Sequence, residues 1–448
     1  MLRALAVDEA VEHLKALVRF DTTNPPGNEL PVIEYVARVL RVEGIEAQVF
    51  EPAPGRANLV ARLRGDGSKG ALLLTSHVDV VLAEAARWTY PPFEAVERDG
   101  YIWGRGTVDM KGMTAFQLAT MVALKRAGAT LERDVILLVL ADEEAGMTWG
   151  SKWMVENQPD LIRAEYALNE VGGFSATVGG MRLFLVGTAE KGICWMRLTA
   201  QGDTGHGSLP GGRNAVVAVA EAAARLSRAR LGGEVRPSAR AFFEEIAAAA
   251  GGARGSVVRG LLRDATREVS LRVLERAQPD DARVFRAILR NTATPTGLRA
   301  GEKENVVPGS AEAIIDGRIL PGTSLEAYMA RVRRVVGKGI EVEVLQSGDP
   351  GEVAIDSELM AVIREVVAAG DPGAKAVPWL NVGFTDAHHL SKLGVQCYGF
   401  YPLVLPPDLR FAGLFHGDDE RVPVEGYRRG MGIFMEVVER FAGAGGNV

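Results

Sequence analysis

The stretch Leu72–Val81, LLLTSHVDVV, joins the apolar run of a buried strand to two polar, titratable residues at its end. Side chains at positions i and i+2 of a strand point to the same side, so His77 and Asp79 share a face. Burying a polar or charged group without a partner costs several kcal/mol. The pair therefore either satisfies itself within the core, as most buried polar groups do, or holds a ligand.

The segments around this stretch alternate between strand-like and helix-like patterns, and the final segment is helical again. The short apolar runs predict strands within residues 57–65, 70–81 and 133–144, and helical spacing predicts helices over 8–20, 30–43, 112–127 and 424–442. Such alternation favours an α/β fold with a mixed, largely parallel sheet that helices cover on both faces.

The pattern changes in the middle of the chain, where strand and helix signals follow an order close to β-α-β-β-α-β. This order is typical of a ferredoxin-like α+β domain. An Ala- and Arg-rich segment over about 235–300 interrupts it and predicts two or three additional helices. The sequence therefore predicts one domain over 1–190 and 352–448, with a second domain inserted over 191–351.

The composition excludes several classes of protein. A chain of 448 residues is too long for one compact core. A net charge of −6 gives no electrostatic reason to expect nucleic acid or an anionic membrane as a partner. The two cysteines, Cys194 and Cys397, argue against a disulfide framework or a Cys-based zinc site. Because neither a membrane span nor a signal peptide is evident, we predict a cytoplasmic protein.

Further polar residues lie where apolar strands end or helices begin. They are Asp109 in GRGTVDMKGM, Glu143 and Glu144 in LVLADEEAG, Glu170 in YALNEVGG and His416 in FHGDDERVPV. Ligands of open α/β sheets bind at the carboxyl ends of the strands. Core packing must explain each patch separately, whereas a metal site explains all of them together.

The set of donors indicates which metals fit. Two histidines and three carboxylates without a thiolate suit zinc or a similar divalent ion. Five ligands exceed the three that are usual at one catalytic zinc, so two metals that share a carboxylate fit better. Asp79 then has a role as the partner that orients the ring of His77, because a metal-bound imidazole usually donates its other N–H to a carboxylate.

The chain resembles the M20 family of co-catalytic zinc peptidases and amidohydrolases, which includes aminoacylases, acetylornithine deacetylase, succinyl-diaminopimelate desuccinylase and glutamate carboxypeptidase. The motifs that carry the resemblance occur in family order and are SHVDVV, GRGTVDMKG, ADEEAG, GHGSLP, NVVP with DGRILPG, and FHGDDERVPV. WTYPPF, GYIWGRGTVDMKG and TPTGLRAGEKENVVPG are most similar to the carboxypeptidase S and N-acyl-amino-acid hydrolase branch.

The resemblance implies a role for each residue of the metal site. His77 and Glu170 would hold one metal, Glu144 and His416 the other, and Asp109 would bridge them. The metals would be zinc, with cobalt or manganese as alternatives. The resemblance also implies a cis peptide bond after Asp109. Glu143 would be the general base that activates a metal-bridging water and passes its proton to the leaving amine.

The inserted domain would be the family's lid and the interface of a homodimer. There, His206 would stabilise the oxyanion, usually in the partner's site, although a surface histidine is the alternative. Asn305 and Arg318 would bind the substrate carboxylate. For them the alternatives are a turn cap and a structural salt bridge.

Asp386 resembles a Thr-Asp-Ala near the family's site, but its N-cap-like position gives an equally good structural account. The adjacent His388 and His389 are expected to start a helix.

The resemblance implies hydrolysis of the amide bond of an N-acyl-amino acid or of a short peptide with a free carboxylate. The 235–300 insertion suggests a larger acyl or side-chain pocket. A binding or regulatory protein on the same fold is the alternative from another class, but it conflicts with the presence of every ligand and the base. The same residues would also serve condensation of an amino acid with an acyl group.

Overall fold

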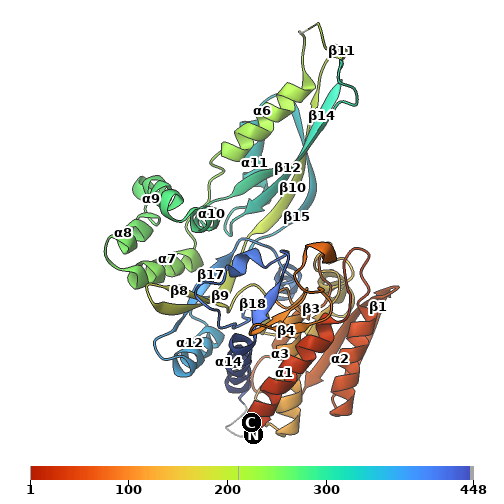
Figure 1. The fold of residues 1–448 in the computed structure, drawn as a ribbon, viewed down its shortest axis with the longest axis vertical. Coiled ribbons are helices and arrows are strands. Elements are labelled where there is room, and N and C mark those ends of the chain that lie inside the picture. The colour runs from red at the N-terminus through yellow and green to blue at the C-terminus, as the bar shows by residue number, and fades with distance from the viewer. Residues whose placement is uncertain (1, 210, 444–448) are drawn as a thin grey trace. The chain divides into compact units, whose positions relative to one another are not determined.

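The computed structural model describes residues 2–209 and 211–443 and divides the chain into two compact units (Figure 1). The first unit comprises the described residues of Met1–Thr188, Val353–Trp379 and Thr385–Val448, and the second comprises Ala189–Glu352 and Leu380–Phe384. Pro210, the last residue of the GHGSLP motif, lies outside the described residues.

The sequence-based division placed the short segment Leu380–Phe384 in the first domain, whereas the structure assigns it to the second unit. The backbone N–H of Lys191 donates a hydrogen bond to the carbonyl of Asn381 at 3.1 Å. The segment therefore belongs to the second unit, although it lies between two parts of the first unit in the sequence.

A mixed sheet has the strand order β1-β2-β6-β3-β7-β18-β9-β16, with β8 and β17 paired to β9. Most of this sheet forms the centre of the first unit, whereas β16 and the last two residues of β9 and of β17 belong to the second unit. The strands are β1 (Ala47–Ala53), β2 (Arg56–Leu63), β3 (Leu72–His77), β6 (Val135–Leu140), β7 (Tyr166–Asn169), β8 (Ser175–Val178), β9 (Met181–Glu190), β16 (Gly351–Glu352), β17 (Lys375–Asn381) and β18 (Gln396–Gly399). The pairs β6–β3, β3–β7 and β7–β18 are parallel, whereas β1–β2, β2–β6 and β18–β9 are antiparallel. The predicted α/β class is confirmed, and the parallel pairs occupy the centre of the sheet.

Helices cover both faces of this sheet, as the continuous apolar strands predict. Leu72 and Leu74 point into a core formed with α1, α2, α3, α12 and α14, whereas Leu73 points into a second core formed with α4, α5 and α13. These helices are α1 (Leu2–Val18), α2 (Leu30–Val42), α3 (Lys111–Arg126), α4 (Ser151–Asn157), α5 (Pro159–Ile162), α12 (Glu358–Gly370), α13 (Ala387–Leu390) and α14 (Val424–Ala442). A small sheet of β4 (Val96–Arg98), β5 (Tyr101–Trp103) and β19 (Arg421–Pro423) completes the unit, with short 3-10 turns at Ala85–Arg87, Ser391–Leu393 and Phe411–Gly413.

An aromatic cluster around Phe116 joins α3 to the C-terminal part of this unit. Phe116 is fully buried, and its ring centroid lies 4.5 Å from that of Tyr427 and 5.2 Å from that of Tyr401. We expect Phe116→Ala to lower the free energy of unfolding by about 3–5 kcal/mol, because it leaves a cavity in a packed core. Urea unfolding would measure this loss, and the exposed Leu5→Ala should change stability by less than about 0.5 kcal/mol. Equal effects of the two substitutions would contradict the packing described here.

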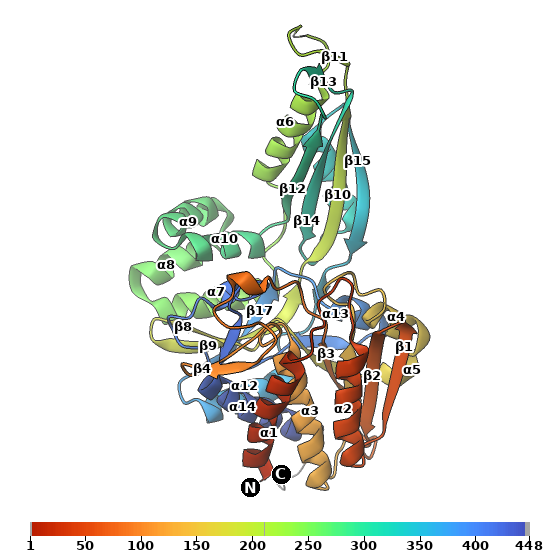
Figure 2. The same ribbon diagram turned by 45° about the vertical axis from the view of Figure 1, so that its right-hand side comes forward.

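The second unit contains an antiparallel sheet of order β12-β14-β10-β15, with α6 and α11 packed on one face (Figure 2). Its elements are β10 (Gly192–Gln201), β11 (Gly205–His206), α6 (Ala215–Arg228), α7 (Pro237–Ala250), α8 (Gly252–Gly260), α9 (Asp264–Ala277), α10 (Pro279–Ile288), β12 (Thr292–Ala300), β13 (Val306–Val307), β14 (Ser310–Ile319), α11 (Leu325–Val336) and β15 (Ile340–Gly348). Without α7 to α10, the chain order of this sheet and its helices is β-α-β-β-α-β, the ferredoxin-like layout.

The 235–300 segment corrects the sequence analysis in two respects. Its described residues form the four helices α7 to α10 rather than two or three, and its last part is the strand β12. Pro295 and Gly297 obscure the strand pattern, and the pairing with β14 is irregular between them. Proline is tolerated here because β12 lies at the edge of the sheet.

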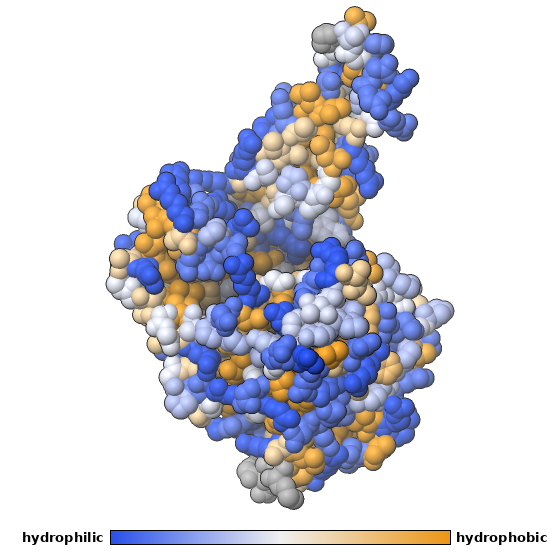
Figure 3. Space-filling view, viewed as in Figure 1, coloured by the Kyte–Doolittle hydropathy of each residue, from blue (hydrophilic) through white to orange (hydrophobic). Residues whose placement is uncertain are grey.

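Hydrophilic residues cover most of the first unit on the face that Figure 3 shows, with isolated hydrophobic residues between them. Leu82 is one exposed hydrophobic residue of this unit. Within residues 2–209 and 211–443, every helix is too short or too polar to cross a membrane.

Candidate metal centre

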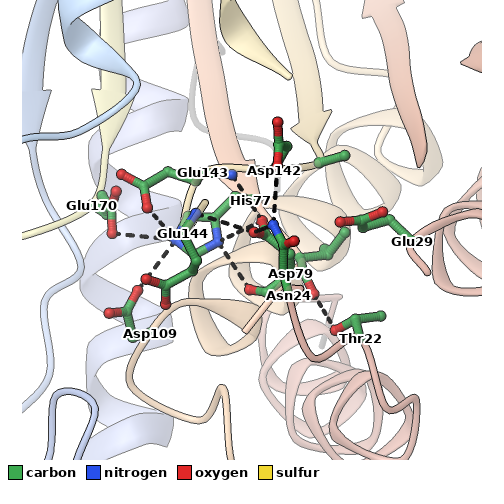
Figure 4. Close-up of polar contacts among 12 residues, drawn as sticks. Thr22, Asn24, Glu29, His77, Asp79, Asp109, Asp142, Glu143, Glu144 and Glu170 are labelled. Carbon is green, nitrogen blue, oxygen red and sulfur yellow. Dashed lines mark hydrogen bonds and ion pairs between the residues drawn. The ribbon is translucent and has the colours of Figure 1, made fainter. Parts of the chain in front are cut away.

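The predicted ligands of the first unit lie at one edge of its sheet. His77 ends β3, Glu170 directly follows β7, and Glu143 and Glu144 follow β6. Because β6, β3 and β7 are parallel neighbours, their carboxyl ends meet at the same edge. Figure 4 shows these side chains close together around His77.

Asp109 lies between the two histidines. Its Oδ1 is 3.2 Å from Nε2 of His77, and its Oδ2 is 3.3 Å from Nε2 of His416. The loop that presents Asp109 precedes α3, and the Asp109–Met110 peptide bond is cis, as the resemblance implied. Each histidine thus faces a different oxygen of one carboxylate, which is the arrangement that a bridging ligand requires.

The glutamates divide between the two histidines. Glu170 Oε2 lies 3.6 Å from Nε2 of His77, and Glu144 Oε2 lies 3.2 Å from Nε2 of His416. Glu143 Oε2 is farther away, at 4.0 Å from Nε2 of His77. The structure therefore brings together the five predicted ligands and the predicted base.

Among the described residues, two groups of potential ligand atoms are compact enough for one ion each. One contains His77, Asp109 and Glu144, and the other contains His77, Glu143 and Glu170, with the atoms of each group within 4.8 Å of one another. The second group includes Glu143, which the resemblance makes a base rather than a ligand. The longer distance from Glu143 to His77 favours the role of base.

Asp79 contacts more than the ring of His77. Its Oδ1 lies 3.4 Å from Nδ1 of His77 and accepts a hydrogen bond from the backbone N–H of Glu143 at 3.1 Å. Its Oδ2 accepts the backbone N–H of Glu144 at 3.1 Å and an amide hydrogen of Asn24 at 2.8 Å. Fully buried Asp79 therefore also holds the backbone of the adjacent glutamates in place.

The charges of the site are unbalanced without a cation. Burial raises the pKa of Glu144 to about 7 and the pKa of Glu170 to about 8. Burial and the charge of Glu170 raise the pKa of Glu143 well above its usual range. Hydrogen bonds to Asp109 and Glu144 raise the pKa of His416 to about 10. The carboxylates thus lie close together in a buried space, where the charges of His77 and His416 lower the pKa values that burial raises.

An unsatisfied atom supports a metal at this place. Glu144 Oε1 is buried and has no hydrogen-bond partner among the described residues. A buried polar atom without a partner is costly, and metal coordination removes that cost. With the histidine and carboxylate donors, this atom makes the site fit a pair of divalent cations such as zinc.

Asp386 is not the helix cap that the sequence allowed. It occupies the N-cap position of α13, but its side chain makes no capping hydrogen bond. Burial raises its pKa to about 6, and its Oδ1 has no hydrogen-bond partner among residues 2–209 and 211–443. His388 and His389 lie within α13, as predicted, and His389 Nδ1 is 2.9 Å from the hydroxyl of Ser151.

The predicted lid residues belong to the second unit. His206 is exposed on β11, with its Nδ1 2.8 Å from the hydroxyl of Ser208. The backbone carbonyl of Asn305 accepts a hydrogen bond from Gly207 at 2.8 Å, so the structure brings Asn305 near His206. Their predicted catalytic and binding roles remain predictions.

Arg318, on β14, already has a carboxylate partner. Its guanidinium donates to both oxygens of Asp316, at 2.8 and 3.1 Å. This pair is the salt bridge that the sequence left as an alternative. Binding of a substrate carboxylate by Arg318 remains a prediction, and it requires sharing or replacing Asp316.

Comparisons with known proteins find a family model and several similar proteins. The family model described as Peptidase family M20/M25/M40 matches residues 73–440. The N-fatty-acyl-amino acid synthase/hydrolase PM20D1.1 of Danio rerio is 28% identical over an alignment of 393 residues, and the match covers 86% of this chain and 75% of that protein. Aminoacylase-1 of Sus scrofa is 26% identical over an alignment of 447 residues, and the match covers 97% of this chain and 95% of that protein.

One solved structure shows the same fold across nearly the whole chain. The M20 family metallo-carboxypeptidase Sso-CP2 of Sulfolobus solfataricus has a TM-score of 0.70 and 18% sequence identity, and the match covers 96% of this chain and 99% of that chain. At this identity, the likeness concerns the fold alone.

Proposed function

The chain belongs to peptidase family M20/M25/M40, and we propose that it is a di-metal hydrolase that cleaves the amide bond of an N-acyl-amino acid or short peptide with a free carboxylate. The position of Asp109 between His77 and His416 carries this proposal, because its two oxygens face different histidines.

The proposed ligands are His77 and Glu170 for one metal and Glu144 and His416 for the other, with Asp109 shared. Zinc is the metal that this donor set favours, with cobalt or manganese as alternatives. Bound metals would polarise the scissile carbonyl and lower the pKa of the attacking water.

Glu143 is the proposed general base. Its side chain lies beside the ligands, with Oε2 4.0 Å from Nε2 of His77. Burial and the charge of Glu170 raise its pKa, which favours acceptance of a proton. The hydrogen bond from its backbone N–H to Asp79 holds it in place. Glu143 would take a proton from the attacking water and deliver it to the leaving amine.

The residues proposed to bind the oxyanion and the substrate carboxylate belong to the second unit. By the family resemblance, His206 would stabilise the oxyanion, Asn305 and Arg318 would bind the substrate carboxylate, and a homodimer would form through this unit. The names of the two relatives support an acylated amino acid as the substrate. The residues of the site would also serve the condensation reaction, which the name of the Danio rerio relative includes.

Metal dependence and substrate class can be tested in one assay. We expect chelation to abolish hydrolysis of N-acyl-amino acids and dipeptides, and zinc or cobalt to restore it with two metals per chain. Comparing acetyl with long-chain acyl substrates tests the larger acyl pocket that the α7–α10 insertion suggests. Metal binding without turnover of any substrate would instead favour a binding protein on this fold.

A further inference from the structure

Glu420, directly before β19, is fully buried, and its carboxylate accepts hydrogen bonds from backbone N–H groups of another loop. Its Oε1 accepts hydrogen bonds from the backbone N–H groups of Val108 at 2.7 Å, Asp109 at 3.1 Å and Gly106 at 3.1 Å. Its Oε2 accepts the N–H of Gly106 at 3.1 Å and a guanidinium hydrogen of Arg105 at 2.7 Å. One carboxylate therefore fixes the backbone that presents the bridging aspartate.

Arg105 extends this network to two further loops. Its Nη2 donates to the carbonyl of Leu82 at 3.3 Å and to that of His416 at 3.5 Å. Its guanidinium lies 5.2 Å from the centroid of the Trp88 ring, and the side chain is almost completely buried. His416 has a φ of 58°, which a residue with a side chain rarely adopts without support from its surroundings.

A buried ion pair is weak evidence for overall stability. Removing two charges from water costs several kcal/mol per ion, and their mutual attraction offsets that cost only where the geometry is good and additional hydrogen bonds are present. Glu420 has these bonds because three backbone N–H groups share its oxygens, and bonds to an ionised acceptor are about twice as strong as neutral ones. The bonds converge on the two loops that carry Asp109 and His416.

We propose that Glu420, held by Arg105, is a positioning residue that sets Asp109 and His416 at the spacing that two metal ions require. This inference rests on the proposed function of the cluster. Glu420 acts through the backbone of its neighbours and contacts neither metal nor substrate.

The variant Glu420→Gln tests this role. Glutamine has nearly the same size as glutamate, but one of its oxygens is replaced by an NH₂ group, which can only donate. This group would face either the backbone N–H groups or the Arg105 guanidinium, which are also donors, so at least one hydrogen bond would be lost. We expect the dissociation constant of Zn²⁺, measured by titrating the apoprotein against a competing chelator, to rise about 10–100-fold. KM at saturating metal should stay near that of the parent, because Glu420 does not touch substrate.

A matched control separates positioning from general destabilisation. Glu439 on α14 is also buried and pairs with Arg3 in the same unit, so Glu439→Gln makes the same chemical change away from the cluster. This control should keep the zinc affinity of the parent. An equal loss of affinity in both variants, or no loss in Glu420→Gln, would overturn the inference.

Arg105→Lys provides a second route if Glu420→Gln does not fold. Lysine keeps the charge but lacks the planar fork that reaches Glu420 and the carbonyl of His416 together. We expect about a tenfold weaker zinc affinity, and unchanged affinity in this folded variant would refute the role. Failure of the proposed function would appear differently, as a parent protein that binds no zinc or hydrolyses no amide.

Discussion

Replacing Glu143 by glutamine is expected to lower kcat by a factor of about 10²–10⁴ while both metals stay bound. Glutamine has nearly the same shape but cannot accept a proton from water. The backbone N–H of residue 143 would still donate to Asp79, so the variant should keep its local structure. Steady-state kinetics and metal analysis on the same preparation would measure the two quantities together.

The matched control for this experiment is Glu132→Gln, which removes a charge from an exposed partner of Lys69 in the same unit. It should retain the kcat of the parent. A Glu143→Gln variant that loses a metal would reassign Glu143 as a ligand, in line with the compact group it forms with His77 and Glu170. A variant with parental kcat and both metals would remove Glu143 from the mechanism.

The substitution Asp109→Asn is expected to cause a loss of metal as well as of activity, because it affects both proposed metals. An amide offers one neutral oxygen and one NH₂ group in place of two anionic oxygens, so one of the two positions loses its shared ligand. We expect fewer than two metals per chain and a fall in kcat/KM of at least about 10³, beyond the 10–100-fold cost of changing a residue that only supports a ligand.

Asp134 provides the control for this change. Its carboxylate pairs with Arg62 at 2.7 Å and Arg64 at 3.0 Å in the same unit and away from the cluster. Asp134→Asn should keep both metals and the activity of the parent within a few fold. If Asp109→Asn also retained two metals and full activity, Asp109 would not be a bridging ligand.

The sequence predicted the cluster because its members are titratable residues at the ends of apolar strands. His77 ends β3 and Glu170 follows β7, and parallel pairing alone brings such positions to one edge of the sheet. Sequence periodicity also predicted the helices, since α14 (Val424–Ala442) lies where the pattern placed it. Local sequence patterns were therefore sufficient to predict the central strands and helices of the first unit and the candidate ligands.

The sequence did not predict features that depend on contacts between distant loops. Glu420 lies in the same motif as His416, but its hydrogen bonds to the loop at Asp109 cross more than 300 residues of chain. Asp386 has the pattern of a helix cap, yet burial near other carboxylates decides its environment. The edge strand β12 was missed because Pro295 interrupts its pattern while its edge position tolerates proline.

The wide separation of the ligands along the chain has a consequence for biosynthesis. His77, Asp109, Glu144 and Glu170 are synthesised before the second unit, whereas His416 follows both of its segments, Ala189–Glu352 and Leu380–Phe384. At translation rates of about 5–20 residues per second, this delay lasts on the order of tens of seconds. A chain whose synthesis stops before His416 would therefore carry an incomplete centre, so that hydrolytic competence would require synthesis beyond this residue.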